Sequence, residues 1–183
     1  RPVRWRQADA MALPFADGEF DAVVCQFGAM FFPDKPHAFA EARRMLRPDG
    51  TFLFNVWDRI EENEFAAAVG DALGRVFPDD PPQFMARTPH GYHDVDAIAR
   101  DLAAAGFGSP PRIETIAFRC RAESARAVAI AYCQGTPWRN EIEARDPSML
   151  DAATDAAEAE IARRFGHGAV SARMQAHVIE AGM

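Results

Sequence analysis

The sequence lacks several features that would assign it to a specialised class of protein. Lys35 is its only lysine, and the formal net charge at pH 7 is −7. A chain without a broad basic field has little to attract a phosphate backbone, so we expect neither nucleic acid nor an anionic membrane as a partner. The sequence also has no apolar run of about 18 residues and no charged leader before a hydrophobic stretch. These absences predict a cytoplasmic protein.

Disulfide and metal patterns are missing too. The three cysteines, Cys25, Cys120 and Cys133, are widely spaced and form neither a CxxC pair nor a Cys/His metal pattern. We therefore expect reduced, mostly buried thiols and no metal.

The residues that are present predict an α/β fold. Hydrophobic residues make up 49% of the 183, which is enough for one domain with a substantial core. Residues 3–7, 20–27 and 51–57 read as strands, and a helix beginning at Pro33-Asp34 and ending at "RPDG" (47–50) separates the last two. The apolar run "FDAVVCQF" does not alternate, which favours a parallel strand covered on both faces. Strand, helix and strand in this order indicate a βαβ unit.

The remaining segments are predicted in less detail. We expect helices over 62–77, 94–106, 123–133 and 148–165, and a strand over 113–120. Residues 171–181 suit a terminal strand or a short helix.

Three segments in this order resemble the second half of a class I S-adenosylmethionine-dependent methyltransferase of the small-molecule type. They are "QADAMALPFADGEFDAVVCQFGAMFFPD" (7–34), "HAFAEARRMLRPDG" (37–50) and "TFLFNVW" (51–57). The resemblance implies a Rossmann-like, doubly wound and mostly parallel sheet whose ligands lie at the carboxyl ends of the strands. It also implies that residues 1–183 are the C-terminal part of a single methyltransferase domain, with a helical substrate-recognition insertion over 121–168.

The resemblance assigns cofactor contacts to two places. By analogy with the family, Asp9 accepts a hydrogen bond from the adenine amino group, the backbone of Ala10 pairs with the ring, and Met11 packs on its face. The alternative for Asp9 is a simple turn cap.

Cys25, Gln26 and Phe27 match the segment that lines the methionine part of S-adenosylmethionine. Gln26 can both donate and accept there. Phe31 is a candidate acceptor contact or a core aromatic.

The family's glycine-rich loop and the acid that follows its second strand have no counterpart in this sequence. The fold is therefore expected to be incomplete at its N-terminus. We expect a piece of a longer enzyme, and weak or no cofactor binding by these 183 residues alone.

Candidate acceptor residues lie downstream. His90, Tyr92 and His93 cluster in "TPHGYHD" and are candidate catalytic bases. Alternatively, Tyr92 packs in the core while the histidines are solvated or cap the next helix. A metal bound by these histidines is weakly supported, because only three loosely placed ligands are present.

A second group of residues suits a planar or carboxylated acceptor. Tyr132, Trp138 and Arg139 surround a Gly-Thr-Pro turn, and Trp57 ends a strand on the ligand side. The alternative for Trp138 is a core anchor.

Three functions compete. The favoured one is methyl transfer to a small-molecule acceptor, and the second is a non-catalytic remnant that works as a binding or oligomerisation module. A nicotinamide-dependent oxidoreductase is disfavoured because the sequence has no Tyr-xxx-Lys pair. A homodimer contact through the acidic helix over 151–165 stays open.

Overall fold

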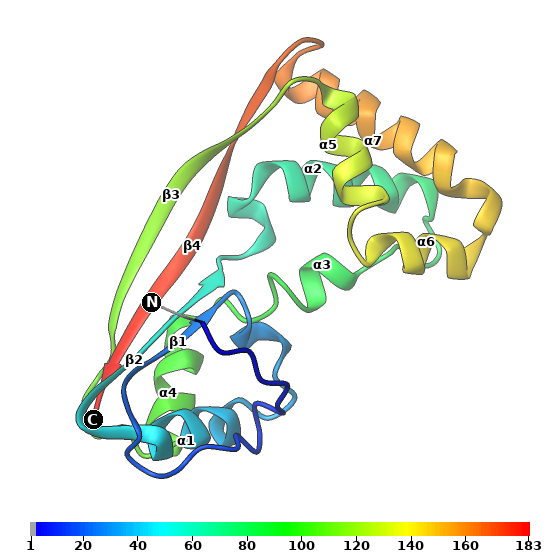
Figure 1. Cartoon of the computed structure of the whole chain (residues 1–183). Helices are drawn as coiled ribbons and strands as arrows, with labels where there is room; N and C mark the ends of the chain where they lie inside the picture. Colours follow the sequence, from blue (N-terminus) through cyan, green and yellow to red (C-terminus); the bar gives the residue numbers. More distant parts are fainter. Residues whose placement is uncertain (1–2) are drawn as a thin grey trace. The chain divides into compact units, whose positions relative to one another are not determined.

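The computed structural model describes residues 3–183, which form two compact units (Figure 1). Unit 1 contains residues 3–56, Asp94–Glu114 and His177–Met183, and unit 2 contains Trp57–His93 and Thr115–Ala176. The chain therefore passes from one unit to the other four times.

A four-stranded open sheet has the order β1-β2-β4-β3. Its strands are β1 (Phe20–Gln26), β2 (Leu46–Trp57), β3 (Arg112–Ala122) and β4 (Val170–Gly182). β1 and β2 are parallel, with Cys25 opposite Phe54. β4 runs antiparallel to β2, because Met183 N donates to Gly50 O while Asp58 N donates to Gln175 O. The α/β class and the parallel β1-α1-β2 unit are confirmed, and residues 171–181 are strand rather than helix.

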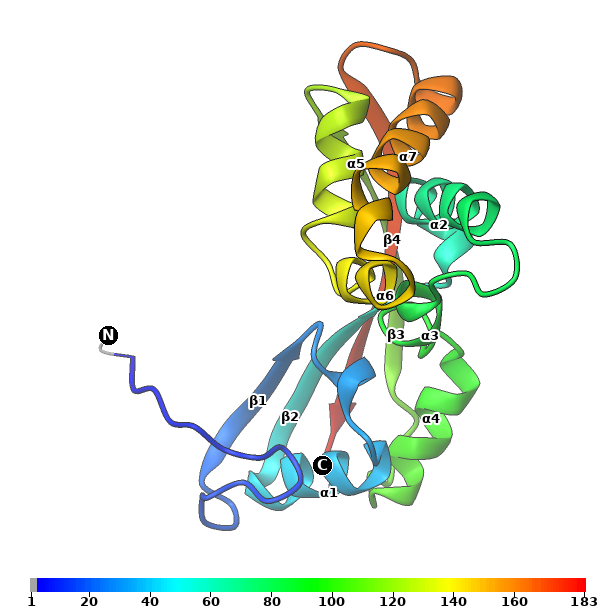
Figure 2. The ribbon, with the colours of Figure 1, turned by 90° about the vertical axis from the view of Figure 1, so that its right-hand side faces the viewer.

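Two helices cover one face of the sheet in unit 1 (Figure 2). Helix α1 (Lys35–Met45) begins where the Asp34 carboxylate accepts a hydrogen bond from His37 N, and it buries Phe39. The Phe39 ring lies 5.0 Å from that of Phe54, measured between centroids. Helix α4 (Val95–Ala104) has Asp94 as its N-cap, as predicted.

The expectation that β1 is covered on both faces is wrong for unit 1. Val24 is 66% exposed and Leu53 is 37% exposed. Both lie on the face that carries no helix among the described residues of this unit. A continuous apolar run indicates that both faces of a strand are suited to burial. It does not show that a helix or another segment packs on each face.

Residues 3–7 are not a strand, contrary to the prediction. Val3 is 71% exposed and Trp5 is 92% exposed. A strand needs a hydrogen-bonding neighbour, and none of the four strands pairs with this segment. The prediction that "RPDG" (47–50) forms a turn before the strand is also wrong, because these residues lie inside β2. They interrupt its regular pairing with β1 at the position of Asp21.

Unit 2 is built on three packed helices. They are α2 (Glu64–Val76), α5 (Ala125–Cys133) and α7 (Leu150–Phe165), and each falls within a range predicted to be helical. Their shared core includes Val69, Ala129 and Ile161, all fully buried. Two shorter helices were missed, α3 (Phe84–Arg87) and α6 (Trp138–Arg145).

The described residues also contain short helical elements. Three are 3₁₀ turns, η1 (Ala29–Phe31), η2 (Ile60–Glu62) and η3 (Pro147–Met149), and another is the single-turn helix α3. Within residues 3–183, no helix has the length and apolar character needed to span a bilayer.

Candidate functional site

Three of the residues singled out in the sequence meet in unit 2. Trp57, His90 and Tyr132 come from three separate segments and line one cavity of about 110 Å³. We call it the histidine cavity. Its walls are completed by Asn63, Met85, Cys120 and Met174.

His90 is the buried titratable group of this cavity. It is only 4% exposed, and its Nδ1 lies 2.8 Å from the Asp58 carbonyl oxygen. A carbonyl oxygen can only accept, so Nδ1 carries the proton and Nε2 keeps a lone pair. Burial is the main reason why the His90 pKa lies below its ordinary value. The ring is therefore neutral near pH 7.

The Nε2 atom of His90 has no hydrogen-bond partner among residues 3–183, because the contact with Asp58 uses Nδ1. The Trp57 ring lies nearby, at a centroid distance of 6.1 Å from the His90 ring. A nitrogen with an unused lone pair on a buried ring can accept a proton from a ligand.

A hydrogen-bond network around Asn63 holds the His90 anchor in place. The Asn63 amide nitrogen lies 3.3 Å from Asp58 O, 3.2 Å from Arg59 O and 3.2 Å from Gln175 O. Its Oδ1 accepts from Gln175 N at 3.1 Å. These bonds fix the Asp58 carbonyl, which accepts the hydrogen bond from His90 Nδ1, between the end of β2 and β4.

Tyr132 supplies the second polar group of the cavity. Burial raises its pKa to about 12, and the nearby Cys120 adds to this effect. The hydroxyl therefore stays protonated at every physiological pH. It has no hydrogen-bond partner in the described part of the chain.

The other two candidate bases lie beside the cavity rather than on its wall. His93 Nδ1 lies 2.8 Å from the His90 carbonyl oxygen, and Tyr92 is 9% exposed. Neither is among the cavity-lining residues. Their catalytic role stays a prediction.

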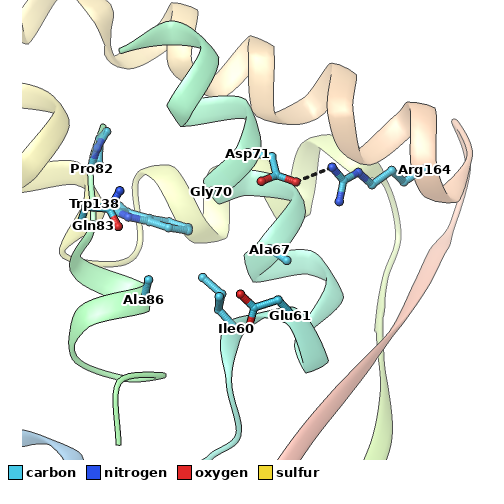
Figure 3. Close-up of a pocket in the computed structure, with 10 residues that line it drawn as sticks. All are labelled: Ile60, Glu61, Ala67, Gly70, Asp71, Pro82, Gln83, Ala86, Trp138 and Arg164. Carbon is cyan, nitrogen blue, oxygen red and sulfur yellow. Dashed lines mark hydrogen bonds and ion pairs between the residues drawn. The ribbon is translucent and has the colours of Figure 1, made fainter. Parts of the chain in front are cut away.

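Trp138 lines a different cavity of unit 2, of about 420 Å³ (Figure 3). Its indole ring points toward Gly70 of α2, and the cavity is also lined by Asp71 and Arg164, which form an ion pair of 2.6 Å. Trp138 is 1% exposed, and the centroid of its ring lies 6.1 Å from that of Tyr132. Arg139 instead pairs with Glu143 on the exposed side of α6. The structure therefore pairs the two aromatic residues and separates Arg139 from them.

In unit 1, Asp9 organises a tight turn. Its Oδ1 accepts from Met11 N at 2.9 Å, and Ala12 N donates to the Asp9 carbonyl at 3.0 Å. This is the turn cap that the sequence left open as an alternative. Asp9 Oδ2 has no hydrogen bond within residues 3–183, so the carboxylate keeps one free acceptor.

The segment after this turn is tied to helix α1. The Arg44 guanidinium donates to the carbonyl oxygens of Leu13 and Phe15, at 3.0 and 2.8 Å. Glu41 accepts from Leu13 N, and its hydrogen bonds with Arg44 are the main reason why its pKa falls to about 2. The "LPF" segment (13–15) is thus held by a charged pair that is fully ionised at neutral pH.

The end of β1 carries the second group of predicted cofactor contacts. Phe27 has φ +48°, in the left-handed region that is uncommon for aromatic residues. Its N–H donates to Asn55 Oδ1 at 2.9 Å, which holds the strained turn. Asn55 lies inside β2 and had no sequence signal.

The neighbours of Phe27 differ in exposure. Burial raises the Cys25 pKa, and hydrogen bonds from the backbone of Gly28 and Ala29 partly offset this rise. Gln26 is exposed beside a hollow of about 320 Å³ lined by Val24, Leu53, Phe54, Asn55 and Val178. Phe31 is 53% exposed, so it is not a core aromatic.

Residues 1–54 match the family model of a methyltransferase domain. A ubiquinone/menaquinone biosynthesis C-methyltransferase of Paracoccus denitrificans is 31% identical over 115 residues, which are 58% of this chain and 46% of that protein. A malonyl-[acyl-carrier protein] O-methyltransferase of Geobacter sulfurreducens is 36% identical over 102 residues, covering 56% of this chain and 36% of its own length. The chain spans less than half the length of each of these two relatives.

One solved structure extends the likeness over both units. A provisionally assigned methyltransferase of an antibiotic biosynthesis pathway in Anabaena variabilis superposes with a TM-score of 0.59 at 18% identity. The match covers 96% of this chain and 72% of that one. At this identity the likeness establishes the fold, and it confirms the predicted α/β architecture.

Proposed function

We propose that the chain belongs to the class I methyltransferases and takes part in methyl transfer from S-adenosylmethionine to a small-molecule acceptor. The observation that carries the proposal is the match of residues 1–54 to a methyltransferase domain. These residues include both predicted cofactor segments, 9–11 and 25–27.

The residues of unit 1 fit the adenosine end of this cofactor. Asp9 has one carboxylate oxygen engaged by Met11 N and the other free, so it can accept from an exocyclic amino group without losing its turn. Met11 is half-buried next to it and offers an apolar contact for a flat base.

At the methionine end of the cofactor, Gln26 offers an exposed amide with one donor and one acceptor side. Phe27 presents its carbonyl from a backbone turn that Asn55 fixes. Such fixed groups suit the charged amino-acid end of a ligand.

The bound cofactor would supply an electrophilic methyl group on a sulfonium. The protein's share is to hold the acceptor, exclude water and accept a proton where the acceptor carries one. In unit 2 the histidine cavity offers an apolar lining with one neutral base, His90. We assign the histidine cavity to the binding of the methyl acceptor.

Calorimetric titration of the full-length gene product with S-adenosylhomocysteine tests the cofactor half of the proposal. Asp9→Asn keeps an oxygen that can accept from Met11 N. It replaces the other oxygen by an amide NH2, which cannot accept a hydrogen bond from the adenine amino group. We expect affinity to fall about tenfold in Asp9→Asn and at least as much in Asp9→Ala, the loss of one hydrogen bond to a charged acceptor.

Asp49→Ala is the matched control, because Asp49 is an exposed acid elsewhere in unit 1. Its affinity should equal that of the parent protein. No binding by the full-length protein would refute the proposal and favour the non-catalytic module. Equal affinity of all variants would remove Asp9 from the site. Titration of the 183-residue chain alone tests the prediction that it binds the cofactor weakly.

A further inference from the structure

The histidine cavity is small for a ligand site. Its volume of about 110 Å³ compares with roughly 150 Å³ for an apolar protein cavity that holds one benzene molecule, and with about 300–1,000 Å³ for ordinary ligand pockets. Only one ring, or a flat group of similar size, fits this space after modest adjustment of its walls.

The walls suit an aromatic ring. Trp57 and Tyr132 provide aromatic surfaces, and Met85 and Met174 provide flexible thioethers that adapt to a flat shape. Asn63 adds no free polar group, because its amide is already committed to three carbonyl oxygens and one N–H. Besides Asn63, the polar groups of the lining residues are those of His90 and Tyr132, the Cys120 thiol and the indole N–H of Trp57.

The polar atoms select the functional group that the ring carries. The His90 ring is buried and its Nε2 has no hydrogen-bond partner within residues 3–183, so an unsubstituted hydrocarbon would bring no donor for it. A carboxylate would face the lone pair of a neutral imidazole and gain nothing from it. A hydroxyl satisfies Nε2 by donating to it, and its oxygen can still accept from the Tyr132 hydroxyl.

The charges around His90 keep the ring ready to take a proton. Asp58 and Glu61 favour the charged imidazolium, whereas burial and the neighbouring His93 oppose it. The other titratable groups of the cavity, Cys120 and Tyr132, line its wall. With burial the largest influence, the resting ring is neutral, and the two acids stabilise the charge that appears when a proton arrives.

We propose that His90 is a catalytic residue, whose Nε2 accepts the proton of a hydroxyl group on a single-ring aromatic acceptor bound in the histidine cavity. The inference rests on the proposed methyl transfer. As the O–H bond breaks, its proton moves to Nε2 and its electron pair stays on oxygen. That oxygen forms a bond to the methyl carbon, the carbon–sulfur bond breaks, and its electrons neutralise the sulfonium. The imidazolium then releases the proton to water.

Phenol and toluene are the probes for binding, because toluene has the same ring with a methyl group in place of the hydroxyl. In the full-length protein saturated with S-adenosylhomocysteine, we expect phenol to bind at least about tenfold more tightly than toluene, the worth of one good hydrogen bond. Nitrogen NMR of labelled histidine should show the Nε2 signal of His90 moving on phenol addition. Equal affinity for both probes, or an unmoved Nε2 signal, would overturn the inference.

His90→Asn tests the proton transfer without removing the structural hydrogen bond. Its amide nitrogen can occupy the place of Nδ1 and donate to Asp58 O, while Nε2 is lost. With radiolabelled S-adenosylmethionine and phenol, we expect kcat for anisole formation to fall about 10²–10⁴-fold. His167→Asn, at an exposed histidine of unit 2, should keep the parent rate.

The pH profile separates a base from a merely structural residue. The parent rate should level off above the lowered pKa of His90, whereas the residual rate of His90→Asn should keep rising toward the pKa of phenol, about 10 as for tyrosine. Parallel profiles, or no anisole formation by the parent protein, would overturn the inference. The proposed function would fall only if S-adenosylhomocysteine also failed to bind.

Discussion

Replacement of Asn63 by alanine should destabilise unit 2 by about 3 kcal/mol. The Asn63 side chain is 5% exposed and makes four hydrogen bonds to backbone groups. The three donor contacts are long, at 3.2–3.3 Å, and we assign them about 0.5 kcal/mol each, at the low end for neutral pairs. The part-buried Gln175 N–H loses its acceptor, which costs about 1–3 kcal/mol more.

Urea unfolding followed by circular dichroism measures this loss. With a typical dependence of about 2 kcal/mol per molar urea, the midpoint should fall by roughly 1.5 M. Asn63→Asp keeps an acceptor for Gln175 N–H but sets a carboxylate oxygen against three carbonyl oxygens, so it should be at least as unstable. Asn140→Ala, at an exposed asparagine of α6, should stay within about 0.5 kcal/mol of the parent. A loss below about 1 kcal/mol for Asn63→Ala would refute this account of the network.

Two further predictions concern the helices of unit 2. Gly70→Ala and Gly74→Ala should each stabilise the protein by about 0.5–1 kcal/mol in urea unfolding, because glycine is costly inside α2 and neither new methyl meets an obstacle. The methyl at residue 70 would lie at an ordinary contact distance of 3.7 Å from the Trp138 ring, and that at residue 74 would meet nothing within 4 Å. A loss of stability in Gly70→Ala would show that the ring is more tightly confined. The stability that Glu160 contributes should be complete above its ordinary pKa of 4.5 and should disappear as the pH falls toward 2, because hydrogen bonds from Arg163 lower its folded-state pKa to about 2. Urea midpoints of the parent and Glu160→Gln should therefore converge over that pH range, and a constant gap would contradict the ion-pair explanation.

Local signals in the sequence predicted most of the fold. Asp34 and Asp94 cap helices as expected, and the apolar run from Phe20 became β1. The error at residues 3–7 has a physical cause, since strand propensity says nothing about whether a partner strand is present. Helix α6 was missed because "WRNEIEAR" has only two buried positions, too few for a clear apolar face.

The candidate site was only partly predictable. Trp57, His90 and Tyr132 were each chosen for their chemistry, but their meeting in one cavity depends on contacts between distant segments. Asn63 and Gln175 had no signal, because side chains that bond to backbone groups leave no periodic pattern. The fixed tautomer of His90 likewise depends on a carbonyl oxygen, a group that every residue carries. The roles of these residues in catalysis stay predictions.

The four crossings between units 1 and 2 have a consequence for biosynthesis. Met183 N donates to Gly50 O, so the sheet of unit 1 closes only after residue 183 has left the ribosome. Such distant pairings slow folding and leave the unpaired edge of β2 open to other chains in the meantime. We expect nascent chains to need protection by chaperones during that interval. Neither unit is a continuous stretch of sequence, so a single proteolytic cut cannot release either one intact.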